Sequence, residues 1–416
     1  MIKVAQLQLF SESTGRAALR LHKAFLTNGI NSTIVSLKPG INDDEKIVQK
    51  GNMPKLIAWL DGKLKTYLMK NNLKGFGFFS YPVFGTNVSK MKEIMEADYI
   101  YVHWALGGFL NLSNMEQLAR LQKPIIFFMH DMWPITGGCH QSLTCEKYKS
   151  HCFDCQIFPK NKKNDLSFKG FEKKLKFYSK YTNLFFISPS KWLFDCAKQS
   201  ALTRNKPIFY IPNLLDLTIF KPLDKKTAKQ LFNIDPNERV ILFGATSISS
   251  PYKGWAYLLE ALNNLSHEPN FKNTSLLIFG GGYKKEIADE IPFKTKFAGH
   301  LSDEYSTALI YNAADVFVAP SLADNLPTTI LESLNCGTAV VGFNVGGIPD
   351  MIKHKQNGYL AQYKNANDLS EGIKFCLENK LKGFNMPEFE PSAILNKHID
   401  LFNQIKSYGN MNLTNG

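Results

Sequence analysis

The chain has 416 residues, of which 44% are hydrophobic and 20% charged, and it carries a net charge of +13. This length and apolar content fit two folded domains, each with its own core. No run of 18 or more apolar residues occurs, so the sequence predicts no membrane-spanning helix. The start, MIKVAQLQLF, alternates like a buried strand and lacks the features of a signal peptide. We therefore expect a cytoplasmic protein, free or at the inner face of the membrane.

The positive charge is concentrated in the first half of the chain. Residues 1–206 hold 30 Lys and Arg against 15 Asp and Glu, which leaves the remainder near −2. This asymmetry favours an anionic partner for the first half, such as a membrane surface, a lipid diphosphate or nucleic acid. The alternative is plain solubility in a lysine-rich composition.

Apolar runs alternate with amphipathic stretches along the whole chain. The first half predicts a helix at residues 17–26 and strands at 2–9, 32–37, 99–104, 124–130 and 184–188. The second half predicts strands at residues 240–244, 275–279, 296–299 and 316–319, and helices at 255–265, 305–313 and 392–408. This order predicts an α/β protein with two Rossmann-like domains that face each other across a cleft, with ligands at the carboxyl ends of the strands.

The stretch at residues 316–350 carries the strongest functional signal. A strand ends at Pro320, a polar loop holds Asp324 and Asn325, and a helix runs from Pro327 through Glu332. A helix N-terminus offers backbone N–H groups to a phosphate, and carboxylates accept hydrogen bonds from sugar hydroxyls. The alternative is a pair of ordinary surface acids.

This stretch resembles the donor-binding signature of the retaining glycosyltransferases of family 4, which have the two-domain GT-B fold. The resemblance rests on Pro320-Ser321, on the acidic pair Asp324 and Glu332, and on Cys336-Gly337 at the helix end. The family has Glu where this chain has the shorter Asp324. The connector at residues 210–222 resembles the family's interdomain passage.

The resemblance implies transfer of a sugar from a nucleotide diphosphate sugar, a UDP- or GDP-sugar, to a glycan or lipid-linked acceptor. The pathway would be biosynthesis of a surface polysaccharide, lipopolysaccharide or capsule, and catalysis would require no cofactor. It also implies an acceptor-side domain at residues 1–208, a nucleotide-sugar domain at 209–390 and a terminal helix at 391–408 that packs back on the first domain.

The same resemblance assigns roles to individual residues. Lys253 would hold the leaving diphosphate, Asp324 and His130 would contact the donor sugar, and Glu332 the ribose. Ala245 stands at the family's usual Arg position. Further donor contacts are expected at Gly15, Thr246, Gly299, His300, Leu301, Asn325 and Leu326, and acceptor-side contacts at Arg16 and His103.

Simpler readings remain open for several of these residues. Lys253 and Arg16 can be solvated surface charges, His130 can be a structural residue capped by Asp131, and His103 can belong to the core. Glycines 280–282 lack the remaining features of a dinucleotide fingerprint, so nicotinamide and flavin cofactors are not expected.

Four cysteines fall within residues 139–155, namely Cys139, Cys145, Cys152 and Cys155. The last two form a Cys-x2-Cys pair, so a structural zinc site is one hypothesis and four unmetallated thiols are the other.

Aromatic residues at helical spacing within residues 160–180 alternate with lysines. This pattern is typical of a helix lying on anionic lipid, and also of a surface helix docked on its own domain. Two other functions stay open: a basic Cys-cluster protein that binds nucleic acid, and a catalytically inactive nucleotide-sugar binder. We expect no nucleic acid partner, because no base-stacking motif or reading helix occurs.

Overall fold

The computed structural model describes residues 1–10, 15–38, 47–49, 52–69, 78–158, 163–245, 250–282 and 288–414. It divides the chain into two compact units. Unit 1 comprises Met1–Leu214 with Ser392–Gly416, and unit 2 comprises Leu215–Pro391. The boundary thus falls after Leu214 rather than after residue 208, and the last segment belongs to unit 1.

Unit 1 is built on a seven-stranded parallel sheet in the order β3-β2-β1-β4-β5-β6-β7. The strands are β1 (Lys3–Phe10), β2 (Asn31–Lys38), β3 (Ile47–Gln49), β4 (Tyr99–Val102), β5 (Ile125–Phe128), β6 (Leu184–Ser188) and β7 (Ile208–Tyr210). The helices are α1 (Arg16–Thr27), α2 (Asn52–Met69), α3 (Lys92–Met95), α4 (Leu112–Ala119), α5 (Leu166–Lys180), α6 (Lys191–Gln199) and α13 (Pro391–Thr414).

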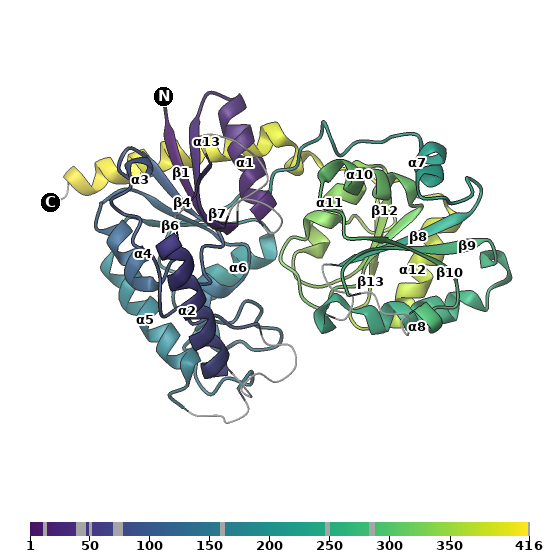
Figure 1. The fold of residues 1–416 in the computed structure, drawn as a ribbon, viewed down its shortest axis with the longest axis horizontal. Coiled ribbons are helices and arrows are strands. Elements are labelled where there is room, and N and C mark those ends of the chain that lie inside the picture. Colours follow the sequence, from purple (N-terminus) through teal and green to yellow (C-terminus); the bar gives the residue numbers. More distant parts are fainter. Residues whose placement is uncertain are drawn as a thin grey trace. The chain divides into compact units, whose positions relative to one another are not determined.

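Each face of this sheet has its own apolar core. Met115 of α4 and Phe171 of α5 belong to one core, whereas Phe25 of α1 and Phe402 of α13 belong to the other. The hydroxyl of Tyr99 donates to the carbonyl of Phe402 at 3.1 Å, so strand β4 holds the terminal helix directly. Figure 1 shows this yellow helix lying across unit 1. The helix extends to Thr414, six residues beyond its predicted end.

Helix α5 is an ordinary docked helix rather than a lipid-facing one. Its aromatic residues Phe171 and Tyr178 are completely buried against the sheet, and Phe177 is nearly so. The sequence periodicity correctly predicts this helix, and the apolar face of the helix packs against the core of unit 1. Among the described residues, no helix has the length and apolar character needed to cross a bilayer.

Unit 2 contains a six-stranded parallel sheet in the order β10-β9-β8-β11-β12-β13. Its strands are β8 (Arg239–Ala245), β9 (Thr274–Gly280), β10 (Lys294–Gly299), β11 (Val316–Ala319), β12 (Ala339–Phe343) and β13 (Gly358–Ala361). Its helices are α7 (Lys225–Leu231), α8 (Trp255–Ser266), α10 (Glu304–Ala313), α11 (Thr328–Asn335) and α12 (Ala366–Glu378). Helices α8 and α12 cover one face of the sheet, and α7, α10 and α11 cover the other (Figure 1).

The strand order decides which loops meet. Strand β8 pairs with β11 in parallel, with Val316 opposite Ile241. The carboxyl ends of the two strands therefore lie at one edge, and the loops that leave them are neighbours. The β11-loop-α11-β12 succession follows the strand-loop-helix-strand order expected from the sequence. Helix α11 ends before Gly337, which has a φ of +81°.

Candidate functional site

The loops that follow β8 and β11 are packed directly against each other. The backbone N–H of Leu322 donates to the carbonyl of Tyr252 at 2.7 Å. Gly254 has a φ of +71°, and a Cβ at this position would lie 1.9 Å from the carbonyl oxygen of Pro320. Only glycine fits such an approach, so this position fixes how closely the two loops pack.

This packing brings two of the predicted site residues into contact. The ammonium of Lys253 lies 2.7 Å from Oδ2 of Asp324, and the two side chains are 25% and 18% exposed. The ring of Tyr252 lies 5.5 Å from the same ammonium. Burial opposes the charged form of Lys253, but the charge of Asp324 and its hydrogen bond outweigh that effect and raise the pKa of Lys253.

The loop that follows β12 contacts the backbone of Asp324. The N–H of Gly347, after β12, donates to the carbonyl of Asp324 at 3.2 Å. At Gly346, where φ is +59°, a Cβ would lie 2.0 Å from the same oxygen. The sequence contains this pair as NVGGIPD, and the two adjacent glycines were the signal of a close backbone approach.

The two residues that follow Asp324 point inward. Asn325 and Leu326 are both buried, at 3% and 5% exposure, and the N–H of Asn325 donates to Oδ1 of Asp324 at 3.1 Å. Their predicted contacts with a donor would therefore involve backbone atoms or a local rearrangement rather than exposed side chains.

Glu332 lies in the second turn of α11 and is held by α10. Its side chain is 4% exposed, and the hydroxyl of Tyr311 donates to Oε2 at 3.3 Å. The ring of Tyr311 packs edge-on against Phe279 at the end of β9, with centroids 5.8 Å apart. Phe279 in turn covers Gly244 near the end of β8, where an added Cβ would meet the ring. This chain of contacts keeps Glu332 at the same carboxyl edge as the Lys253–Asp324 pair. No sequence signal had pointed to Tyr311.

Three other predicted donor residues of unit 2 lie at the end of β10. Gly299 has a φ of +71° with open space around it, His300 is exposed, and Leu301 packs partly on the core. Thr246 falls outside the described residues.

In unit 1 the structure pairs His130 with His103. His103 Nδ1 and His130 Nε2 are 2.9 Å apart, and His103 Nε2 lies 2.9 Å from Oε1 of Gln6. An amide oxygen only accepts, so His103 donates to Gln6 and accepts from the N–H of His130 when both rings are neutral. The two rings and Trp133 line a small cavity of about 20 Å³.

Both imidazoles are neutral at physiological pH. Burial lowers the pKa of His130 to about 4, partly opposed by the charge of Asp131. Burial, together with the repulsion that a protonated His130 or His398 would exert, holds the pKa of His103 well below its usual value. The sequence left open whether Asp131 caps His130. In the structure Oδ2 of Asp131 lies 2.6 Å from Nδ1 of His140, and its Oδ1 accepts from the N–H of Trp133.

Gly15 and Arg16 open helix α1. A Cβ at Gly15 would lie 2.1 Å from the carbonyl oxygen of Phe10, so the helix start is packed closely against the end of β1. Arg16 is half-exposed in the first turn.

The four clustered cysteines are buried or partly buried in unit 1. Among the residues described here, no group of three or more His, Cys, Asp or Glu side chains is arranged to hold a metal ion. The four thiols lie near one another: burial, together with the neighbouring thiols of the cluster, raises the pKa values of Cys139 and Cys152 to about 12. Sγ of Cys152 accepts a hydrogen bond from the N–H of Gly137. The structural zinc site expected from the cysteine spacing stays a prediction.

Comparisons with known proteins agree with this geometry. Residues 238–379, which include Lys253, Asp324 and Glu332, match the family model described as Glycosyl transferases group 1. The D-inositol 3-phosphate glycosyltransferase of Mycobacteroides abscessus is 26% identical over 210 residues, 47% of this chain and 44% of that protein.

A second curated relative comes from Campylobacter jejuni. Its N,N'-diacetylbacillosaminyl-diphospho-undecaprenol alpha-1,3-N-acetylgalactosaminyltransferase is 26% identical over 190 residues, 42% of this chain and 48% of that protein. Each of these matches spans less than half the length of the relative.

Solved structures resemble nearly the whole chain. HepE of Anabaena, in complex with UDP and glucose, superposes with a TM-score of 0.64 at 16% identity and covers 97% of this chain and 100% of its own. The sucrose-phosphate synthase of Thermosynechococcus elongatus gives a TM-score of 0.61 at 16% identity, with 98% and 100% covered. The chain therefore has the GT-B fold of two Rossmann-like α/β domains, and residues 238–379 of its second unit are similar to glycosyl transferases group 1.

Proposed function

We propose that this protein is a retaining glycosyltransferase of the family 4 type. It transfers a sugar from a nucleotide diphosphate sugar to a glycan or lipid-linked acceptor in the synthesis of a surface polysaccharide. The observation that carries the proposal is the Lys253–Asp324 pair at the carboxyl ends of β8 and β11, inside the segment that matches a glycosyltransferase family model.

Unit 2 supplies the donor site in this proposal. Lys253 places one positive charge on the leaving diphosphate, and the first turn of α11, which begins after Pro327 without a side-chain cap, adds backbone N–H groups. Glu332, oriented by Tyr311, accepts hydrogen bonds from the ribose hydroxyls. The UDP complexes of HepE support a uridine diphosphate sugar as the first donor to test.

The chemical step is electrostatic and positional. The diphosphate leaves with its negative charge compensated by Lys253 and by the helix N-terminus. The acceptor hydroxyl attacks from the face that the diphosphate leaves, and passes its proton to a diphosphate oxygen. The carboxylate of Asp324 accepts hydrogen bonds from the sugar hydroxyls and so orients the sugar. His130, neutral and held by His103, is assigned to the sugar by resemblance to the family.

An inactive donor binder is the second candidate. The family position that usually carries an Arg is Ala245 here, whose side chain is 8% exposed at the end of β8 and cannot compensate a phosphate charge. A protein of this kind would bind nucleotide diphosphate sugars without turnover.

Thermal unfolding with UDP-, GDP- and ADP-sugars tests the proposal. A bound donor at a hundred times its Kd stabilises the folded state by about 2.7 kcal/mol. Lys253→Met should remove most of this shift. Lys374→Met is the matched control, because Lys374 also pairs with a carboxylate, Glu268 at 3.0 Å, but on the surface of helix α12. NMR of the product then reads the anomeric configuration.

Three outcomes have separate meanings. Stabilisation without product favours the inactive binder, and a product of inverted configuration rejects the retaining mechanism. If no nucleotide diphosphate sugar stabilises the wild-type protein, the whole proposal fails. Glu332→Gln adds an internal check, since unchanged donor affinity in this variant would remove Glu332 from the site.

A further inference from the structure

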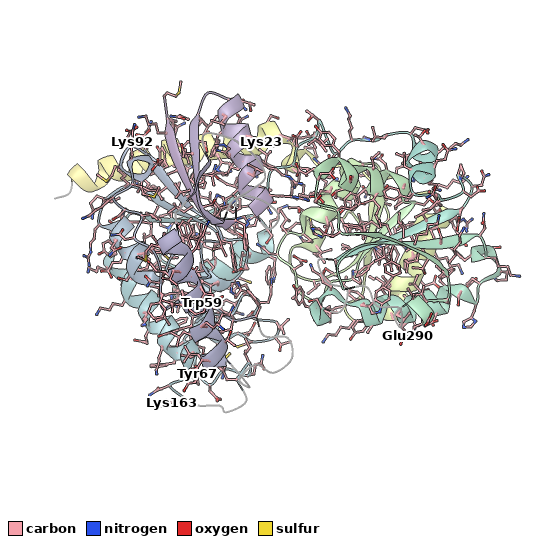
Figure 2. All side chains as sticks on the ribbon, in the orientation of Figure 1. Lys23, Trp59, Tyr67, Lys92, Lys163 and Glu290 are labelled. Atoms are coloured by element: carbon pink, nitrogen blue, oxygen red, sulfur yellow. The ribbon has the colours of Figure 1, made fainter. Side chains whose placement is uncertain are left out.

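Helix α2 presents its large apolar side chains to solvent. Trp59 is 56% exposed and Tyr67 is 77% exposed, and Figure 2 labels both on this helix. Three further apolar residues of the same helix are exposed: Met53, Leu56 and Leu60. A surface helix of a soluble domain normally buries such residues, whereas α2 has apolar residues on two sides, since Ile57, Leu64 and Leu68 are partly buried.

Two contacts fix the orientation of α2. Asp61, on the inner face of α2, is buried and accepts hydrogen bonds from the N–H groups of Val83 and Phe84 at 3.0 and 2.9 Å. A Cβ at Gly108 would lie 2.3 Å from Cα of Ala58, so the helix packs directly against the backbone of the loop between β4 and α4. Turning the exposed apolar residues inward would break both contacts and expose the aspartate.

The outward residues form one continuous stripe. Met53, Leu56, Leu60 and Tyr67 follow each other at steps of three, four and seven positions, which places them on one side of the helix. Trp59 lies beside the stripe. The 18 residues of α2 span about 27 Å at the α-helical rise, long enough for the stripe to lie flat on a surface.

Cations accompany this apolar stripe. Lys55 and Lys63 are exposed on α2, and the ammonium of Lys63 lies 5.5 Å from the ring of Trp59. The only acidic residue of the helix is the buried Asp61. Unit 1 as a whole has 32 Lys and Arg against 16 Asp and Glu, a net charge of +16.

The positive charge of α2 and unit 1 indicates which partner binds this face. A second copy of the chain would bring lysines against lysines, whereas an anionic lipid surface is complementary both to the cations and to the apolar stripe. Aromatic residues such as Trp59 and Tyr67 are also the side chains that suit the headgroup level of a bilayer.

We propose that helix α2 docks unit 1 onto an anionic membrane surface, with the stripe in the headgroup region and the lysines on the lipid phosphates. This inference does not depend on the glycosyl transfer proposed above, since it concerns a different element and can be measured on the protein without any donor.

Sedimentation with vesicles tests the docking. The full-length protein is mixed with phosphatidylcholine vesicles that contain phosphatidylglycerol, and with vesicles of phosphatidylcholine alone. We expect binding to the anionic vesicles only. The double variant Leu56→Ser, Trp59→Ser should bind at least roughly tenfold more weakly. Tyr305→Ser, which removes a 68% exposed aromatic residue of α10 in unit 2, should bind as the wild type does.

A charge-matched pair separates the local surface from net charge. Lys55→Glu, Lys63→Glu reverses two cations of α2, whereas Lys23→Glu, Lys92→Glu reverses two exposed cations elsewhere on unit 1 (Figure 2). The first should weaken vesicle binding by more than roughly tenfold and the second by much less.

Several results would overturn the proposal. Equal loss in both charge variants, equal binding to both kinds of vesicle, or wild-type binding by the Leu56, Trp59 variant would each do so. Failure of the wild type to bind vesicles, together with a dimer in analytical ultracentrifugation that this variant dissociates, would assign the stripe to a second copy of the chain.

Discussion

Lys253 and Asp324 form an ion pair 71 positions apart in the sequence, with 2.7 Å between Nζ and Oδ2. Both residues were expected to contact a ligand, and the structure shows them contacting each other. The ammonium proposed to bind a diphosphate is therefore already compensated by a carboxylate. A diphosphate must share or replace this partner, so the pair couples the phosphate and sugar ends of the proposed donor.

Replacing Asp324 separates its effect on diphosphate binding, through Lys253, from its effect on the donor sugar. Asp324→Asn removes the carboxylate that competes for Lys253, so we expect UDP affinity to rise by roughly fivefold, the scale of a modest ion pair. Transfer from a UDP-sugar should fall, because an amide orients the sugar hydroxyls poorly. Calorimetric titration with UDP and turnover with the UDP-sugar measure the two effects. Weaker UDP binding, equal to that of Lys253→Met, would contradict this division of roles.

Gly254 should be essential for the packing of the two loops. Gly254→Ala places a methyl group against the carbonyl of Pro320 in addition to the strain of a positive φ. Gly29→Ala is the control, since Gly29 has a similar φ of +74° but no atom within 4 Å of an added Cβ. We expect Gly254→Ala to lower the free energy of unfolding by at least about 2 kcal/mol more than the control does. Urea denaturation measures both, and equal losses would mean that the loops separate at no cost.

The strands and the helix of the 316–350 segment could be predicted because runs such as VFVA and AVVGF are buried on both faces of a parallel sheet. The pairing of Lys253 with Asp324 could not. It depends on β8 lying beside β11, and strand order is a tertiary property that periodicity does not contain.

Other failures have the same origin. Asp131 follows His130 in the chain, yet its carboxylate pairs with His140, a contact between residues nine positions apart that the sequence did not indicate. Helix α2 was not predicted, because a periodicity argument assumes that the apolar face is inside. In α2 the buried Asp61 lies on the inner face, and several large apolar residues are exposed. The aromatic periodicity near α5 predicted the helix correctly but did not decide whether lipid or protein covers it.

Buried histidines should make unit 1 sensitive to acid. The folded-state pKa is lowered to about 4 for His130 and to about 3 for His398, both by burial. Between these values and about 6.5 the unfolded chain binds more protons than the folded one. The stability contributed by these neutral rings is therefore complete above pH 6.5 and is lost as the pH falls toward 4.

A variant without the His398 ring checks this dependence. Tyr101 lies 2.9 Å from Nδ1 of His398, so Tyr101→Phe, His398→Leu removes the titrating ring and its polar partner together. The free energy of unfolding should then fall less between pH 6.5 and 4, by about 2–3 kcal/mol over the range. His267→Gln, at an exposed histidine, should leave the acid dependence unchanged. An unchanged slope in the double variant would show that other groups govern acid unfolding.

Lys174 should make the stability of unit 1 depend on pH in the alkaline range, above the range in which the histidines act. The residue is 1% exposed, and its ammonium donates to the carbonyls of Trp133 and Thr136 over the Trp133 ring. Burial lowers its pKa to about 7, although Cys139, Cys152 and Asp131 oppose the shift. Between pH 7 and about 10.5 the unfolded chain holds a proton that the folded one has lost, so the contribution to stability rises with pH there.

Lys174→Met removes both the titration and the two hydrogen bonds. The variant should lose about 1–3 kcal/mol, because two buried carbonyls are left unpaired. The wild type should gain stability relative to the variant as the pH rises from 7 to 9, by about 1.4 kcal/mol per pH unit at most. Lys176→Met, at an exposed lysine of the same helix, supplies the control for charge alone. A difference between wild type and Lys174→Met that stays constant from pH 7 to 9 would mean that Lys174 keeps its proton in the folded state, held there by the carbonyls and by the charge of Asp131.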